Sequence, residues 1–210
     1  MRCSVVTDLS SGDTVIIDGG SESNRIISWI NGFEGVGPNW SNGPESFGEM
    51  AQRGIPARKV IALVNTHAHF DHSGEIPYLL EEYDVSWYLH EADFFLQSLV
   101  QQSAMRWGFE LPEPAVADKL LHDEMVLQLG TLKFRIMHTP GHTLGGCCIL
   151  LDVDDGPSQL FAGDTLFAGS VGRTDLPNSG GDINVLVNSV ITKLSVSYTH
   201  LTLPTSSQVV

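Results

Sequence analysis

The chain has 210 residues and a formal net charge of -14, with 42% hydrophobic and 17% charged residues. This length suits one α/β domain with a substantial core, and the composition is that of a globular protein. The negative charge argues against nucleic acid or an anionic membrane surface as a partner, and no run of 18 apolar residues predicts a membrane span.

The chain begins with two predicted strands at residues 4–9 and 14–18, which form a hairpin. A helix over residues 23–29 follows, with Ser21 or Ser23 as its predicted cap. Gly, Pro, Asn and Ser dominate residues 35–44, which predicts a surface loop, and a short helix is expected near residues 45–53.

Residues 60–64 are apolar and rich in β-branched side chains, which predicts a buried strand. The later predicted elements are a helix at 75–83, a strand at 86–89, helical stretches between 91 and 105, an extended linker at 111–115, strands at 125–129, 131–137, 147–151 and 159–162, and a closing helix at 182–194. Strands with helices on their outer faces, and hairpins at both ends, predict an α/β sandwich of sheets flanked by helices.

The amino terminus and the cysteines both predict a cytoplasmic protein. The first residues, MRCSVVTD, lack the charged and then apolar segments of a signal peptide. Cys3, Cys147 and Cys148 are odd in number and two are adjacent, which is typical of reduced thiols. Alternation along a strand would send Cys147 and Cys148 to opposite faces, so we interpret them as packing residues.

The most informative run is Thr66-His-Ala-His-Phe-Asp-His72, at the carboxyl end of the strand at 60–64. Residues two apart on extended backbone point the same way, so His67 and His69 can aim at one point. Asp71 and His72 follow where the chain turns toward a helix. Imidazole nitrogen and carboxylate oxygen are ligands that zinc accepts, and burying four such groups without a metal would be costly. The run therefore predicts a metal site rather than a polar loop.

Two later motifs place further ligand-type side chains at strand ends. His142 follows the strand at 131–137 in His138-Thr-Pro-Gly-His142, and Asp164 follows the strand at 159–162 in Phe161-Ala-Gly-Asp164. Each lies on a glycine-containing turn that lets the backbone approach a metal closely. Together with residues 67–72, these strand ends can converge at one edge of a sandwich.

The other histidines receive simpler interpretations. His138 is expected to pack near the site without binding the metal, since His142 already supplies a ligand there. His90 is expected to be structural and His122 to be solvated. Arg173 and Asp175 are predicted to pair, either as a brace for a loop near the site or as an ordinary surface ion pair.

The four motifs together resemble the metallo-β-lactamase superfamily, in particular its small glyoxalase II-like hydrolases. They are residues 66–72, Thr139-Pro-Gly-His142-Thr, Phe161-Ala-Gly-Asp164-Thr-Leu-Phe, and Gly172-Arg-Thr-Asp-Leu-Pro177. The resemblance implies an αββα sandwich over residues 1–195, with two mixed β-sheets flanked by helices.

The resemblance also implies a site for two zinc ions, with iron or manganese as alternative metals. His67, His69 and His142 would hold the first metal, Asp71 and His72 the second, and Asp164 would bridge both. Asp71 would also orient the attacking hydroxide, which makes it the expected catalytic residue. The superfamily normally supplies one more histidine from a Pro-Gly-His motif near the carboxyl terminus. This sequence lacks that motif, and its later histidine, His200, lies in a different context.

The function implied by the resemblance is hydrolysis of a thioester of the hydroxyacylglutathione type by a metal-bound hydroxide, with a small-molecule thioester as the partner. Glyoxalase II enzymes of full length carry an added helical domain that holds glutathione, for which this chain has no room. One alternative is a persulfide dioxygenase with a mononuclear iron, whose branch shares the Gly-Arg-Thr-Asp motif of residues 172–175. Others are a lactonase or β-lactamase, and an inactive truncated fragment that binds one metal.

Residues 196–210 are expected to be a non-native tail. Val196-Ser-Tyr-Thr-His-Leu-Thr-Leu-Pro-Thr205 resembles the translation of a transposase-type sequencing adapter. Ser, Thr and Pro dominate from residue 195, with no helical periodicity and no turn that would aim His200 at the metals. The alternative is a genuine variant tail whose residues 201–203 dock as an edge strand.

Deleting residues 196–210 should leave the metal content and the free energy of unfolding almost unchanged. If the tail is foreign, the second metal lacks a terminal imidazole. It should then bind weakly, because a water molecule in that coordination position holds a metal less tightly than an imidazole does. Elemental analysis and denaturant unfolding of the deleted protein check this prediction. A His200→Ala variant that lost the second metal would contradict it, since His200 would then be the missing ligand.

Overall fold

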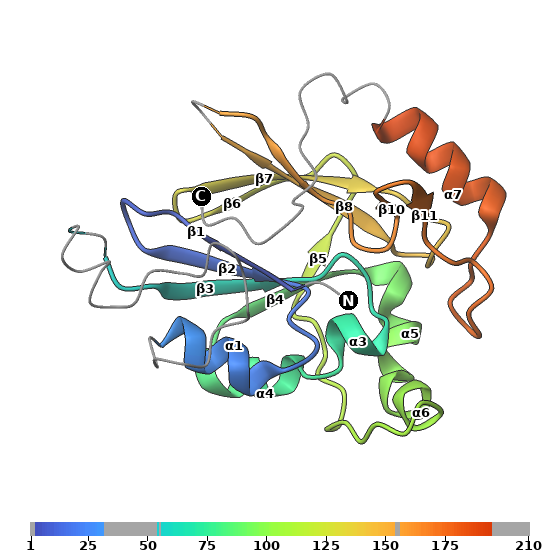
Figure 1. The fold of residues 1–210 in the computed structure, drawn as a ribbon, viewed down its shortest axis with the longest axis horizontal. Helices are drawn as coiled ribbons and strands as arrows, with labels where there is room; N and C mark the ends of the chain where they lie inside the picture. Colours follow the sequence, from blue (N-terminus) through green and yellow to red (C-terminus); the bar gives the residue numbers. More distant parts are fainter. Residues whose placement is uncertain (1–2, 32–53, 55, 154–155, 195–210) are drawn as a thin grey trace.

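The fold is a sandwich of two main β-sheets with helices on their outer sides (Figure 1). It is seen in a computed structural model that describes residues 3–31, 54, 56–153 and 156–194. Helices α1 and α4 cover the outer face of the first sheet, and α7 lies on the far side of the second. The expected αββα architecture is confirmed. The predicted loop at 35–44, the helix near 45–53 and the tail at 196–210 lie outside the described residues.

The first sheet has the strand order β1-β2-β3-β4-β5. Its strands are β1 (Ser4–Thr7), β2 (Asp13–Ile17), β3 (Lys59–Val64), β4 (Ser86–His90) and β5 (Lys119–Leu121). The β1–β2 hairpin is antiparallel, and β2 to β5 pair in parallel, so this sheet is mixed. Strand β5 was not predicted, because it is short and pairs with β4, about 30 positions earlier, so no local pattern marks it.

The second sheet has the order β6-β7-β8-β9 and is antiparallel across its described strands, which corrects the expectation that both sheets are mixed. Its strands are β6 (Val126–Leu129), β7 (Leu132–His138), β8 (Cys147–Asp152) and β9 (Gln159–Phe161). The β6–β7 turn is only two residues long, and so short a connection can join only antiparallel neighbours. A small hairpin of β10 (Leu166–Phe167) and β11 (Ser170–Val171), absent from the sequence analysis, follows β9.

Apart from α3, which was not predicted, the helical elements agree with the predicted ranges to within a few residues. They are α1 (Ser23–Ile30), α3 (Phe70–Ser73), α4 (Ile76–Tyr83), the 3-10 turn η1 (Glu91–Asp93), α5 (Phe94–Ser98), α6 (Val100–Met105), α7 (Ile183–Ser189) and the π-helical turn η2 (Val190–Leu194). Asp182 caps α7 by accepting hydrogen bonds from the N–H groups of Asn184 and Val185.

The predicted cap of α1 is wrong. Its N-cap residue is Glu22, in the left-handed conformation and without a side-chain cap. The N–H of Ser23 donates instead to the Glu75 carboxylate at 2.7 Å, so a side chain 52 residues away replaces the local cap.

Side chains that alternate along the strands fill separate apolar layers. Ile17 and Val64 point between the sheets toward Phe134 of β7, whereas Ile16 packs under the helices of the first sheet. Cys147 joins the layer between the sheets and Cys148 the layer beneath η2. The prediction that the adjacent cysteines face opposite sides is confirmed, and both are free thiols.

Within the described ranges, no helix combines the length and the apolar character that crossing a membrane requires.

The strand directions explain where the ligand-type side chains gather. Because β2, β3 and β4 are parallel, their carboxyl ends share one edge of the first sheet. In the second sheet β7 and β9 are both antiparallel to β8, so they too end at a common edge. The loops from these ends carry residues 67–72, His142 and Asp164.

Candidate metal centre

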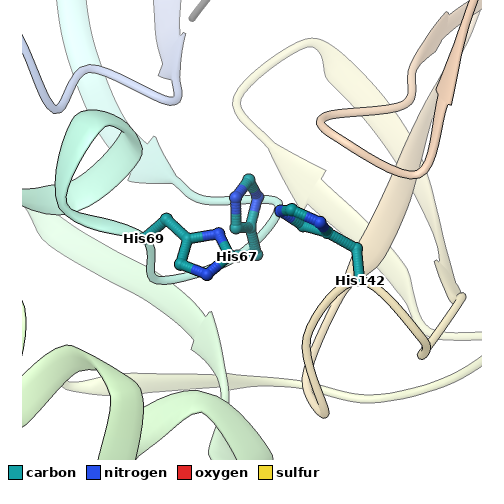
Figure 2. A group of neighbouring side chains, drawn as sticks. All are labelled: His67, His69 and His142. Atoms are coloured by element: carbon teal, nitrogen blue, oxygen red, sulfur yellow. The ribbon is translucent and has the colours of Figure 1, made fainter. Parts of the chain in front are cut away.

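Three histidines from the two sheets meet at this edge. His67 and His69 come from the segment after β3 and His142 from the loop after β7, and their rings gather at one point (Figure 2). One ring nitrogen of each lies within 4.8 Å of the others, a separation that a shared metal ion can span. The ring centroids of His67 and His142 are 4.8 Å apart.

A second group lies beside the first and shares His67 with it. His67, His72 and Asp164 also place one ligand atom each within 4.8 Å of one another. Asp164 lies between the groups, with Oδ2 3.5 Å from Nε2 of His142 and Oδ1 3.4 Å from Nε2 of His72. One carboxylate therefore faces both groups, as a bridging ligand would.

Asp71 lies at the border of this arrangement. Its Oδ2 is 3.7 Å from Nε2 of His72, and its side chain is about a third exposed. It belongs to neither ligand group found among the described residues. Both Asp71 and His72 fall within the short helix α3, which precedes the helix predicted at 75–83.

The unpartnered nitrogens fit a metal. The Nε2 atoms of His67, His69 and His142 are buried, and none makes a hydrogen bond to any described residue. Leaving such atoms desolvated costs free energy unless another group binds them. Three imidazole nitrogens, a fourth on His72 and a carboxylate form the donor set expected for zinc or iron.

Hydrogen bonds on the opposite side of the rings direct Nε2 toward the centre. Nδ1 of His142 lies 2.6 Å from the carbonyl oxygen of Arg173, so it must be the protonated nitrogen. The Thr66 hydroxyl donates to Asp18 at 2.8 Å, which leaves its oxygen to accept from Nδ1 of His67 at 3.0 Å. Both rings are therefore held in the tautomer that presents Nε2 to a metal.

Residues 2–204 match the family profile described as the metallo-beta-lactamase superfamily. The chain belongs to this superfamily.

Curated relatives of this superfamily member include named hydrolases. Hydroxyacylglutathione hydrolase GloC of Haemophilus influenzae is 30% identical over 195 residues, which cover 92% of this chain and 78% of GloC. A Bacillus subtilis protein named "Probable metallo-hydrolase YqgX" is 34% identical over 198 residues, covering 93% of this chain and 77% of that protein.

Solved structures confirm the metallo-beta-lactamase fold. BLEG-1, described as a B3 metallo-beta-lactamase, aligns with a TM-score of 0.68 and 28% identity, covering 90% of this chain and 78% of BLEG-1. TTHA1623, solved in a di-iron-bound form, aligns with a TM-score of 0.66 and 30% identity over the same shares of the two chains. The histidine-rich site of this metallo-beta-lactamase family member is consistent with a centre for two metals.

The electrostatics of the site also favour a cation. Burial and the neighbouring imidazoles lower the pKa of His67 well below its usual value and that of His69 to about 3, so both rings stay neutral, as metal ligands must. Burial would also lower the pKa of His72, but the carboxylates of Asp18 and Asp164 outweigh it and raise that pKa to about 10. The carboxylates around His72 therefore favour a positive charge at this position.

Two glycines let the backbone approach the ligands as closely as it does. A Cβ on Gly172 would lie 1.8 Å from the carbonyl oxygen of Asp164, and a Cβ on Gly20 would lie 2.0 Å from the carbonyl carbon of His72. A side chain at either position would displace a ligand-bearing segment. The Gly172 contact gives the Gly-Arg-Thr-Asp motif a direct role in shaping the site.

The remaining histidines lie outside both ligand groups. His138 stacks on His90 with centroids 4.1 Å apart, and its Nε2 is 2.9 Å from the carbonyl oxygen of Leu144. His122 is exposed. Arg173 and Asp175 form an ion pair on the surface, while the Arg173 carbonyl group reaches His142. The predicted pairing of Arg173 and Asp175 is present and lies on the surface, and the contact of this motif with the site is made by the backbone.

Sequence reasoning missed two buried carboxylates that support the ligands. Asp18 follows β2 and accepts from the N–H and O–H of Thr66, and its Oδ2 is 3.2 Å from Nδ1 of His72. Asp93 ends η1 and contacts both ligand loops. The only local signal for Asp18 was its place before Gly19-Gly20 at a strand end, and nothing in the sequence marked Asp93.

Proposed function

We propose that this chain is a zinc-dependent hydrolase that cleaves a thioester of the hydroxyacylglutathione type. The observation that carries the proposal is the position of Asp164 between two ligand groups, within 3.5 Å of histidines in each. A hydrolase that uses two metals needs such a shared ligand, because its metals lie about 3.5–4 Å apart. The relative named as a hydroxyacylglutathione hydrolase supports the choice of substrate.

The residues present suit this chemistry. His67, His69 and His142 would hold one metal, Asp71 and His72 the other, with Asp164 between them. When bound, two divalent metals supply the activation of a water molecule and the polarisation of a carbonyl group. The partly exposed Asp71 carboxylate lies beside His72 and can accept a proton from a water molecule there. A thiolate leaves readily, so the chain needs no strong acid near the leaving group.

The choice of hydrolysis over oxygen insertion rests on the second ligand group. A mononuclear iron dioxygenase needs a single cluster of ligands, whereas His72 and Asp164 extend this one beyond the three-histidine group. Zinc is proposed because three or four imidazoles with carboxylates suit it at neutral pH, and iron or manganese remain alternatives. A cytoplasmic location is proposed on the free thiols of Cys147 and Cys148.

Thioester cleavage should proceed at the same rate with and without oxygen. Hydrolysis consumes only water, so removing oxygen changes none of the reactants. The measurement is thiol release from a hydroxyacyl thioester of glutathione by zinc-loaded protein, under air and under nitrogen. Parallel assays offer the iron-loaded protein glutathione persulfide, and the zinc-loaded protein a β-lactam.

Oxygen uptake on the persulfide without thioester cleavage would replace this proposal by the dioxygenase. Cleavage of the β-lactam alone would favour the activity named for BLEG-1. Full metal content with no turnover of any substrate would identify an inactive member of the family.

A further inference from the structure

Asp93 is a buried carboxylate that ends the 3-10 turn after β4 and is the N-cap residue of α5. Its side chain is 1% exposed. Within the described residues it accepts three hydrogen bonds: from the N–H of Ala68 to Oδ2 at 3.0 Å, from the hydroxyl of Thr143 to Oδ2 at 3.0 Å, and from the N–H of Gly145 to Oδ1 at 2.6 Å.

These donors belong to the two segments that carry the three-histidine group. Ala68 lies between His67 and His69, and Thr143 directly follows His142. The first segment leaves β3 in one sheet and the second leaves β7 in the other. A single carboxylate on a third segment therefore joins the two halves of the ligand set, alongside the backbone hydrogen bond from the N–H of Cys147 to the carbonyl oxygen of Thr66 at 2.8 Å.

The loop that carries Gly145 packs tightly against the Asp93 carboxylate. A Cβ on Gly145 would lie 2.8 Å from the Asp93 carboxylate, so the loop approaches this side chain as closely as glycine allows. Burial raises the pKa of Asp93, although the Gly145 and Ala68 N–H groups and the Thr143 hydroxyl oppose this shift. Because this carboxylate has so little contact with solvent, the loss of any one of its hydrogen-bond donors would be costly in free energy.

We propose that Asp93 is a positioning residue that sets the separation of the two loops and thereby the metal affinity and geometry of the three-histidine site. The inference rests on the metal site of the proposed function but not on its thioester substrate. Asp93 does not touch a ligand ring through any hydrogen bond found here. It acts through the N–H groups of Ala68 and Gly145 and the hydroxyl of Thr143, beside the rings, whereas the Arg173 carbonyl group binds His142 directly.

The test compares zinc affinity in Asp93→Asn and in the unsubstituted protein, by competition with a chromophoric chelator and without any substrate. Asn has one acceptor oxygen for three donors, and its NH₂ group must face at least one of them. We expect zinc affinity to fall about 10- to 100-fold, the usual effect of losing a partner that orients metal ligands. The visible absorption of the cobalt(II) form should shift, because the ligand geometry changes.

The matched control is Asp118→Asn. Asp118 also accepts two hydrogen bonds, from the N–H of Trp87 and the hydroxyl of Ser86, but it contacts neither ligand loop. Its zinc affinity and cobalt spectrum should stay unchanged. A folded Asp93→Asn protein with the zinc affinity and cobalt spectrum of the unsubstituted chain would overturn the proposal, and an inactive thioester assay would not affect this measurement.

If Asp93→Asn does not fold, Thr143 provides the second comparison. Thr143→Ser keeps the hydroxyl that bonds Asp93, and Thr143→Val removes it at nearly constant volume. The serine variant should keep the cobalt spectrum of the unsubstituted protein, while the valine variant should bind zinc several-fold more weakly. Equal affinities in two folded variants would also overturn the proposal.

Discussion

The His142→Ala variant is expected to lose the first metal and to lose turnover by about 10³-fold or more. His142 supplies the one ligand of the three-histidine group that comes from the second sheet. Without it the first metal would keep only the two imidazoles of a single segment and the shared Asp164 carboxylate. The transition state then loses charge stabilisation of several kcal/mol, at a tenfold change in rate for every 1.36 kcal/mol. Elemental analysis of the purified protein, together with the thioester assay, measures both effects.

His138→Ala is the matched control for this variant. His138 lies four residues earlier, at the end of the same strand, and its Nε2 contacts the carbonyl group of Leu144 rather than the ligand cluster. Its metal content should stay the same. His69→Ala should repeat the loss seen with His142→Ala. If both ligand variants kept their full metal content, the site would have to lie elsewhere.

The Asp18→Asn variant is expected to weaken metal binding about 10- to 100-fold and to lower the free energy of unfolding by about 3 kcal/mol. Asp18 is buried and accepts two hydrogen bonds from Thr66 at 2.8 Å, and its Oδ2 is 3.2 Å from Nδ1 of His72. Asn removes the charge and turns an NH₂ group toward one of these donors. It adopts the left-handed backbone at φ 56 as readily as Asp does, so the effect arises from the side chain.

Asp84→Asn separates the side-chain effect from the backbone effect. Asp84 also has a left-handed backbone, at φ 48, but it is exposed and ends α4. Zinc titration and denaturant unfolding should give the values of the unsubstituted protein. Unchanged zinc affinity in Asp18→Asn would show that the orientation of His67 and His72 does not depend on this carboxylate.

The local pattern of the sequence was enough to identify most of the elements and the ligand-type residues. Residues 60–64 are apolar and rich in β-branched side chains, so they predict a strand from their own composition, and the structure places β3 there. His67, His69, Asp71 and His72 are separated by one or two positions, and their proximity follows from chain geometry. The four ordered motifs were specific enough to indicate the superfamily, which the family profile confirmed.

The tertiary structure decided which groups hold those residues in place. Asp18 reaches Thr66 across 48 positions, Asp93 reaches Ala68 across 25, and the Arg173 carbonyl group reaches His142 across 31. Contacts this far apart depend on strand order, and a single chain carries no periodic signal for strand order. Strand β5 and the capping of α1 by the Glu75 side chain could not be predicted for the same reason, because both depend on contacts between distant parts of the chain. The sequence by itself determined the chemistry of the site, because ligand types and turns are local properties. The fold alone decided which buried carboxylates hold the ligand segments in place, because their hydrogen-bond donors come close only when separate strands end at one edge.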